Sequence, residues 1–154
     1  MPHLSTYVGL ADHSEEALAA SFRQVAEGHA KVADVHHLSL TLAGFSDRHR
    51  EGLAPFVERY GEEDLEEPER LRADALSSTR EGEVGLLRDL QDLHLLATLV
   101  ETTWTVVAQG AQGLRDRDLL ALANSSRSET ERQIQWLTTR IKVAAPQALI
   151  VAPR

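Results

Sequence analysis

Residues 86–114 read LLRDLQDLHLLATLVETTWTVVAQGAQGL. The apolar residues of this stretch recur at alternating spacings of four and three, at Leu86, Leu90, Leu93, Ala97, Val100, Trp104, Val107, Ala111 and Leu114. This spacing lines up one side of an α-helix, so it predicts a helix that faces a core along its whole length. At about 1.5 Å per residue the helix would reach about 40 Å, and other long helices must cover it.

Composition limits the class of protein. The chain has 154 residues, enough for one compact domain, and its 24 Asp and Glu against 16 Lys and Arg give a formal charge of -8. An acidic surface repels nucleic acid and anionic lipid, so we expect neither as a partner. The lack of cysteine excludes disulfides, thiolate catalysis and cysteine metal sites. No apolar run approaches the ~20 residues of a membrane span, and residues 1–4 lack the order of a secretory signal, so we expect a cytoplasmic protein without membrane contact.

Three further segments carry apolar residues at helical spacing. The first begins at Asp12, whose side chain can cap a helix together with Glu15 three residues later. The second runs over residues 34–60, and Pro55 is expected to kink it or to end it early. The last runs over residues 119–146, where a proline ends it.

Between the second and third helices the pattern lapses over residues 62–83. The acidic run of residues 62–68 is expected to be a solvated loop, and residues 70–76 to form a short helix. So long a connection suits a crossover along the bundle, which leaves the second and third helices parallel. The sequence therefore predicts an all-α four-helix bundle with a long crossover between helices 2 and 3.

The bundle is expected to form a single domain over residues 12–146. Residues 1–11 carry no strong pattern and are expected to be an N-terminal arm, and residues 147–154 a C-terminal tail. The apolar residues 149–151 of this tail can pack back or join a partner. Because bundle helices commonly bury leftover apolar faces in dimers, we expect a homo-oligomer or a protein partner.

Polar residues interrupt the apolar stripes at mid-bundle. Parallel second and third helices place His49 near the height of Glu101, and an antiparallel fourth helix places Glu101 opposite Glu129. One imidazole and two carboxylates can hold a single Fe, Mn or Zn ion, or they can form a buried hydrogen-bonded network without a metal. On the first helix, the residues expected at the height of His49 are not strong metal ligands: Ala17, Leu18 and Ser21.

A second group of histidines lies where the first two helices meet. His29, His36 and His37 would share one height if these helices are antiparallel. Three imidazoles can bind a transition metal, but adjacent helical residues diverge by about 100°, so His36 and His37 cannot both point inward. Capping and surface roles are the alternative. Trp104 is expected in the core, with the lining of a ligand pocket as its alternative.

This organisation resembles the ferritin-like superfamily. Residues 109–116 (QGAQGLRD), 139–142 (TRIK) and 145–149 (APQAL) are similar to segments in a group of uncharacterised bacterial ferritin-like proteins, and the resemblance covers about residues 12–146. Di-iron members carry a Glu-x-x-His motif on each of two helices, and this sequence contains none. The resemblance therefore implies a di-iron site that is absent or reduced, with the three mid-bundle residues named above as the remaining counterparts of family ligands.

These observations lead to three expectations about function. The first is a non-enzymatic, ferritin-like helical module that acts through self-association or partner binding. The second is a metal-binding redox protein or metal carrier that uses His49, Glu101 and Glu129. The third is a protein that binds a small apolar ligand between the helices near Trp104.

Overall fold

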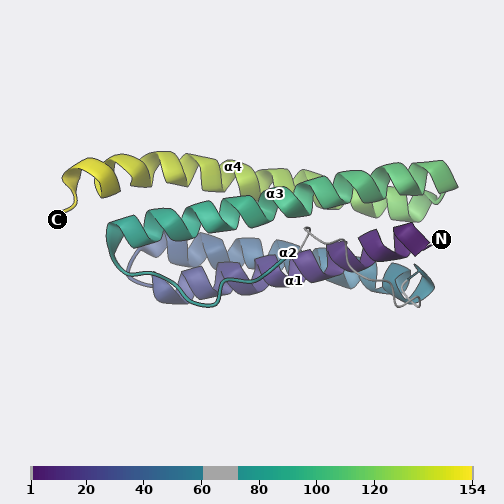
Figure 1. The fold of residues 1–154 in the computed structure, drawn as a ribbon, viewed down its shortest axis with the longest axis horizontal. Helices are drawn as coiled ribbons and strands as arrows, with labels where there is room; N and C mark the ends of the chain where they lie inside the picture. Colours follow the sequence, from purple (N-terminus) through teal and green to yellow (C-terminus); the bar gives the residue numbers. More distant parts are fainter. Residues whose placement is uncertain (1, 61–72, 154) are drawn as a thin grey trace.

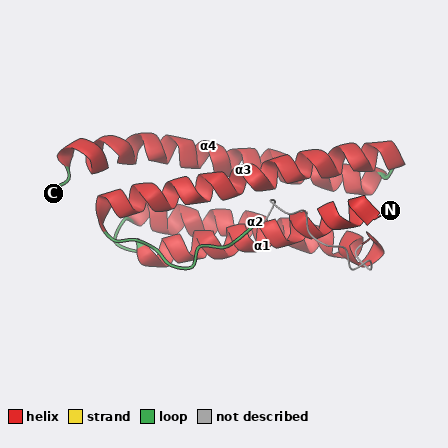
Figure 2. Cartoon of the chain, in the orientation of Figure 1, coloured by secondary structure: helices red, strands yellow, loops and turns green. Residues whose placement is uncertain are grey.

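The computed structural model describes residues 2–60 and 73–153, and these residues form four long α-helices (Figure 1). The helices are α1 (Pro2–Gly28), α2 (Ala33–Tyr60), α3 (Gly82–Leu114) and α4 (Arg117–Pro146). A π-helical turn, η1 (Gln147–Val151), continues α4. Figure 2 shows helices and loops and no strand in these described residues. The predicted all-α four-helix bundle is confirmed.

The helices pack around the bundle in the order α1, α2, α4, α3. Helix α1 contacts α2 and α3, and α4 contacts α3 and α2, so α1 and α4 lie on one diagonal and α2 and α3 on the other. Helices α2 and α3 run in the same direction (Figure 1). The end of α2 at Tyr60 and the start of α3 at Gly82 therefore lie at opposite ends of the bundle, as a long crossover between helices 2 and 3 requires (Figure 1).

The apolar stripe of α3 lies in the core as predicted. From Leu90 to Ala111 its members have no exposed surface, and Trp104 is the largest fully buried side chain. Burial of each large apolar side chain contributes about 1.5–3 kcal/mol, so this stripe is a main source of stability. Leu114 is the exception because it is the last residue of α3 and is 38% exposed.

Helix α1 begins at Pro2, so most of the expected N-terminal arm, residues 1–11, is helical. Val8 and Ala11 are buried and extend the core of α1 toward its start, and the Ser5 hydroxyl donates to the carbonyl of Tyr60 at the end of α2. Proline suits this start because the first position of a helix needs no N–H donor. The expected cap at Asp12 is wrong, because that residue lies in the middle of α1.

Pro55 does not end α2, which continues to Tyr60. A proline inside a helix leaves the carbonyl four residues earlier without its donor, and here that carbonyl belongs to Glu51. Pro55 and Glu51 are both exposed, so water can satisfy this carbonyl and the helix continues.

The described end of the crossover packs along the bundle. The backbone N–H of Leu76 donates to the Ser21 hydroxyl (3.0 Å), and Ala73 and Leu76 pack against the core. Residues 73–76 are not helical, so this part of the expected short helix is wrong. The rest of that helix, at residues 70–72, and the expected acidic loop at residues 62–68 lie outside the described residues.

The two ends of the bundle differ. The start of α1 and the turn between α3 and α4 lie at one end, while the end of α4 and η1 reach past the start of α3 at the other (Figure 1). Ala148 of η1 is buried, but the expected apolar tail is mostly exposed. None of the helices formed by residues 2–60 and 73–153 is long and apolar enough to cross a membrane.

Candidate functional site

One chain of polar contacts crosses the middle of the bundle and takes a residue from every helix. The indole N–H of Trp104 on α3 donates to Glu15 Oε1 on α1 (2.9 Å). The same oxygen accepts from Nδ1 of His49 on α2 (2.9 Å), and Nε2 of His49 lies 3.2 Å from Glu129 Oε1 on α4. Arg48 donates to the other oxygen of Glu129 (3.2 Å). We call this set the mid-bundle chain.

The contacts of His49 favour the positively charged form of its ring. A carboxylate only accepts hydrogen bonds, and a carboxylate faces each ring nitrogen, so both nitrogens must carry protons to make both bonds. Burial lowers the pKa of His49, but the hydrogen bonds and negative charges of Glu15 and Glu129 outweigh it and raise this pKa above its usual 6.5. Arg48 adds a guanidinium at the outer end of the mid-bundle chain, beside Glu129.

The inner part of the chain is buried and the outer part is not. Glu15 is fully buried and His49 is 3% exposed. The Glu129 side chain is 31% exposed and that of Arg48 56%, so water screens their attraction. The electrostatic contribution of the mid-bundle chain to stability therefore comes mostly from the Glu15–His49 pair.

Further polar groups lie between α2 and α4 next to this chain. The Gln133 side-chain N–H groups donate to the carbonyl of Leu42 (2.9 Å) and to the Ser46 hydroxyl (3.1 Å). Four buried side-chain atoms have no hydrogen-bond partner among the described residues: Glu15 Oε2, Ser39 Oγ, Ser126 Oγ and Gln133 Oε1. Because a buried polar atom without a partner costs about 1–3 kcal/mol, this region stabilises the fold less than the apolar core around it.

The structure brings together two of the three predicted mid-bundle residues. His49 and Glu129 meet, but the carboxylate of Glu101 lies beside Thr105 (3.4 Å) and Arg127 (4.0 Å). Glu101 of α3 lies at nearly the predicted height relative to α4, but its part-exposed side chain turns toward Arg127 and away from His49. Trp104, three residues later, points toward Glu15 instead.

Glu15 is the residue that sequence reasoning missed. The spacing of Asp12 and Glu15 favours a helix cap, so the sequence alone does not place Glu15 in the core. The signal that identifies it is periodicity: Glu15 occupies a core position on α1 within the series Val8, Ala11, Glu15, Leu18, Phe22 and Val25. A carboxylate at a core position needs a buried donor, and His49 and Trp104 supply it.

The mid-bundle chain does not converge on an ion. The two nitrogens of His49 point to different carboxylates, on α1 and on α4. Among residues 2–60 and 73–153, no group of three or more His, Asp and Glu side chains is arranged to hold a metal ion. The binding of Fe, Mn or Zn stays a prediction, and the residues present are arranged as hydrogen-bond partners.

The second histidine group also separates into different contacts. His36 Nδ1 donates to the carbonyl of Ala26 (2.7 Å), and the exposed His37 touches the edge of the His36 ring. His29 is buried and bonds Asp89 instead. His29 and His36 therefore make separate structural contacts, and the three imidazoles do not surround a common point.

Asp89 is a second buried acid at the end of the bundle near η1. Its Oδ2 lies 2.7 Å from His29 Nε2 and accepts from the backbone N–H of Arg80 (3.0 Å), while Oδ1 accepts from the Arg80 guanidinium (2.8 Å). Asp89 is fully buried on α3. It joins the end of α1, the end of the crossover and the start of α3, which is a structural role.

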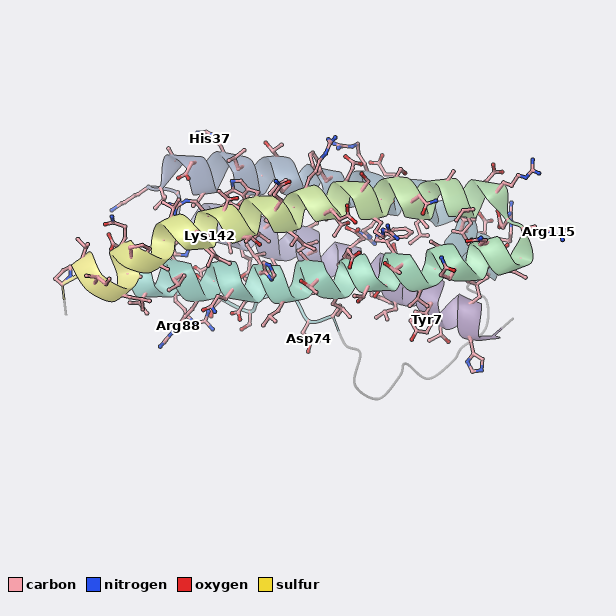
Figure 3. The ribbon with its side chains drawn as sticks, turned by 90° about the horizontal axis from the view of Figure 1, so that it is seen from above. Tyr7, His37, Asp74, Arg88, Arg115 and Lys142 are labelled. Carbon is pink, nitrogen blue, oxygen red and sulfur yellow. The ribbon has the colours of Figure 1, made fainter. Side chains whose placement is uncertain are left out.

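Exposed apolar side chains form the other candidate site. Figure 3 looks onto the face made by α3 and α4, with Arg88 at the outer side of α3 and Lys142 on α4. Two sets of aliphatic residues are exposed there and at the adjoining end of the chain. The first lies on the outer side of α3 and contains Val84, Leu95 and Val106, and the second contains Val143, Leu149, Ile150 and Val151. We call the second set the apolar end.

Comparisons with family models, curated proteins and solved structures gave no match to this chain. The ferritin-like resemblance therefore remains a prediction, and the geometry described above is the ground for any functional conclusion.

Proposed function

We propose that this chain is a non-enzymatic, ferritin-like helical module that acts through self-association or partner binding. The observation that carries the proposal is the apolar end. Its four aliphatic side chains are each more than half exposed, and Leu149, Ile150 and Val151 reach 70%, 82% and 65%. Large apolar residues gathered in one exposed place are typical of a surface that another polypeptide covers.

The mid-bundle chain supports the non-enzymatic part of the proposal. Both nitrogens of His49 are engaged by carboxylates, so this imidazole has no free nitrogen with which to take a proton from a substrate. The buried carboxylate of Glu15 accepts two hydrogen bonds from inside the core. Groups held in this way set the register of the four helices, and function is left to the surface. We also propose a cytoplasmic location, because a chain without cysteine suits a reducing compartment.

Removal of the apolar end tests the proposal. We expect the protein to sediment as a dimer or larger species at about 10–100 µM, and a chain with Leu149→Ser and Ile150→Ser to associate at least about 10-fold more weakly. Leu40→Ser is the matched control, because Leu40 is an exposed aliphatic residue of α2 that is not part of the apolar end. A wild-type chain that stays monomeric over this range, with a sedimentation profile identical to that of the double variant, would contradict self-association.

A further inference from the structure

The outer side of α3 is a long stripe of exposed residues with almost no charge. Its exposed positions between Val84 and Gln109 follow helical spacing: Val84, Arg88, Gln91, Leu95, Thr98, Thr102, Val106 and Gln109. Arg88 is the only charged residue among them. By contrast, exposed charges occur along the outer sides of α2 and α4, in a chain whose formal charge is -8.

The threonines of this stripe can be buried at little cost. The Thr98 hydroxyl donates to the carbonyl of His94 (2.8 Å) and the Thr102 hydroxyl to that of Leu99 (3.0 Å). Both polar groups are thus satisfied inside α3, and their methyl groups remain for contact. Threonine and valine also lose little side-chain freedom when they pack.

We infer that the occupant of this stripe is a second copy of the chain, with two α3 helices packed antiparallel about a two-fold axis beside residue 100. The inference rests on the proposed function and names its partner and its surface. With the axis beside residue 100, each residue of one copy lies opposite the residue of the other copy whose number adds with its own to about 200. Residues of the same chemical kind therefore lie opposite one another. Leu95 meets Val106 of the second copy, and the matching polar pairs are Thr98 with Thr102 and Gln91 with Gln109.

Charge favours a second copy at this place. Two chains of formal charge -8 repel one another, and the stripe itself contains no carboxylate, although the part-exposed Asp92 and Glu101 lie beside it on α3. In the two-fold register Arg88 lies opposite the exposed, uncharged Gln112 of the other copy. The two Arg88 side chains of the dimer are therefore kept apart. The stripe thus combines an apolar centre with polar ends, as protein interfaces do.

The stripe has the size of a small interface. From Val84 to Gln109 it is about 38 Å long at about 1.5 Å per residue, and a helix about 10 Å wide gives about 400 Å² per copy. A standard interface covers about 800 Å² per partner, so the stripe alone supplies about half of one. The antiparallel arrangement also brings the apolar end of one copy to the far end of α3 of the other, where Leu114 is exposed.

Complementary charges at one opposed pair test the register. Leu95→Lys and Val106→Glu, each alone, put unpaired charges into both halves of a symmetric interface, and we expect the dimer dissociation constant to rise at least about 100-fold. A mixture of these two single variants opposes the new lysine to the new glutamate, and so does one chain that carries both changes. Both samples should recover most of the affinity. Leu40→Lys, at an exposed leucine of α2, is the control that keeps the wild-type constant.

Sedimentation equilibrium gives these constants, and circular dichroism confirms that each variant is folded. Recovery in the mixture and in the doubly substituted chain supports the antiparallel pairing. A dimer that ignores Leu95→Lys, or that loses affinity without recovery, overturns the pairing, and the apolar end can still carry the proposed function. A monomeric wild-type chain overturns the pairing together with the self-association part of the proposed function.

A cross-link measures the same register independently. The chain has no cysteine, so Thr98→Cys and Thr102→Cys chains with different tags can be mixed and oxidised without side reactions. We expect rapid disulfide formation between the two kinds of chain, because opposed residues of packed helices meet the distance that a disulfide requires. Thr98→Cys mixed with Gln109→Cys is the control for register. Cross-linking at equal rates in the two mixtures would refute the pairing.

Discussion

Replacement of Glu15 by Gln removes one charge from the buried pair and leaves the other in place. Glu15 is fully buried and His49 is 3% exposed, so water does not compensate for the loss. The glutamine oxygen can still accept from Trp104, and the change in volume is small. The free-energy difference between the two chains therefore reports the charge of Glu15 against that of His49.

The expected loss is about 3–5 kcal/mol in the free energy of unfolding, the usual cost of removing one partner from a buried ion pair. This is a large part of the about 5–15 kcal/mol that stabilises a domain. A second change, His49→Gln, removes the stranded charge, so the doubly substituted chain should be more stable than the Glu15→Gln chain. Their coupling energy is expected to be about 1–3 kcal/mol.

The assay is urea denaturation at about pH 6, followed by far-ultraviolet circular dichroism, for the wild type, both single variants and the double variant. Glu129→Gln is the matched control: it removes the other carboxylate of His49, which is 31% exposed and screened, so it should cost no more than about 1 kcal/mol. Equal losses for Glu15→Gln and Glu129→Gln, or losses that simply add, would refute the reasoning.

Three more outcomes follow from the same contacts. The stabilising contribution of His49 should be full below about pH 6.5 and should decrease as pH rises through its raised folded pKa, so the difference in unfolding free energy between wild type and His49→Gln should shrink toward alkaline pH. The hydrogen bond from Tyr60 and the backbone N–H of Leu119 lower the pKa of Asp116, so Asp116→Asn should cost about 1–2 kcal/mol at neutral pH and progressively less as pH falls through that lowered pKa, measured by urea denaturation. Asp89→Asn should cost about 2–4 kcal/mol in thermal unfolding and should speed amide exchange at Arg80, whose N–H bonds this carboxylate. Unchanged exchange there would contradict the role given to Asp89.

Periodicity predicted the helices because each one buries a long apolar stripe. The α3 pattern from Leu86 to Ala111 lies in the core, and the long gap before it is the crossover. The start of α1 was missed because Asp12 and Glu15 have the spacing of a helix cap, although Val8 and Ala11 continue the apolar spacing of α1 toward its start. Contacts with distant segments, such as Ser5 with Tyr60, also hold this start against the bundle. A sequence pattern cannot contain such contacts.

The sequence predicted the heights of the candidate site residues along the bundle, but not the directions in which all of their side chains point. His49 and Glu129 meet as expected, because the turn after α3 and the crossover fix how far each helix runs. Which side chain of α3 completes the group depends on the rotation of this helix about its axis. A step of three residues along a helix turns the side-chain direction by about 300°. That is why Trp104 occupies the place expected for Glu101. Glu15 was lost for another reason: a cap and a core acid look alike in sequence.

The protonation of the His49 ring tests the role of the mid-bundle chain most directly. Nitrogen-15 correlation spectra of the untagged protein as purified, at about pH 6, report whether each ring nitrogen carries a proton. We predict two protonated nitrogens, each with its own hydrogen-bonded proton, and the loss of the downfield proton facing Glu15 in the Glu15→Gln chain. An unprotonated or metal-bound nitrogen under these conditions would contradict this prediction and would make the mid-bundle chain a reactive site.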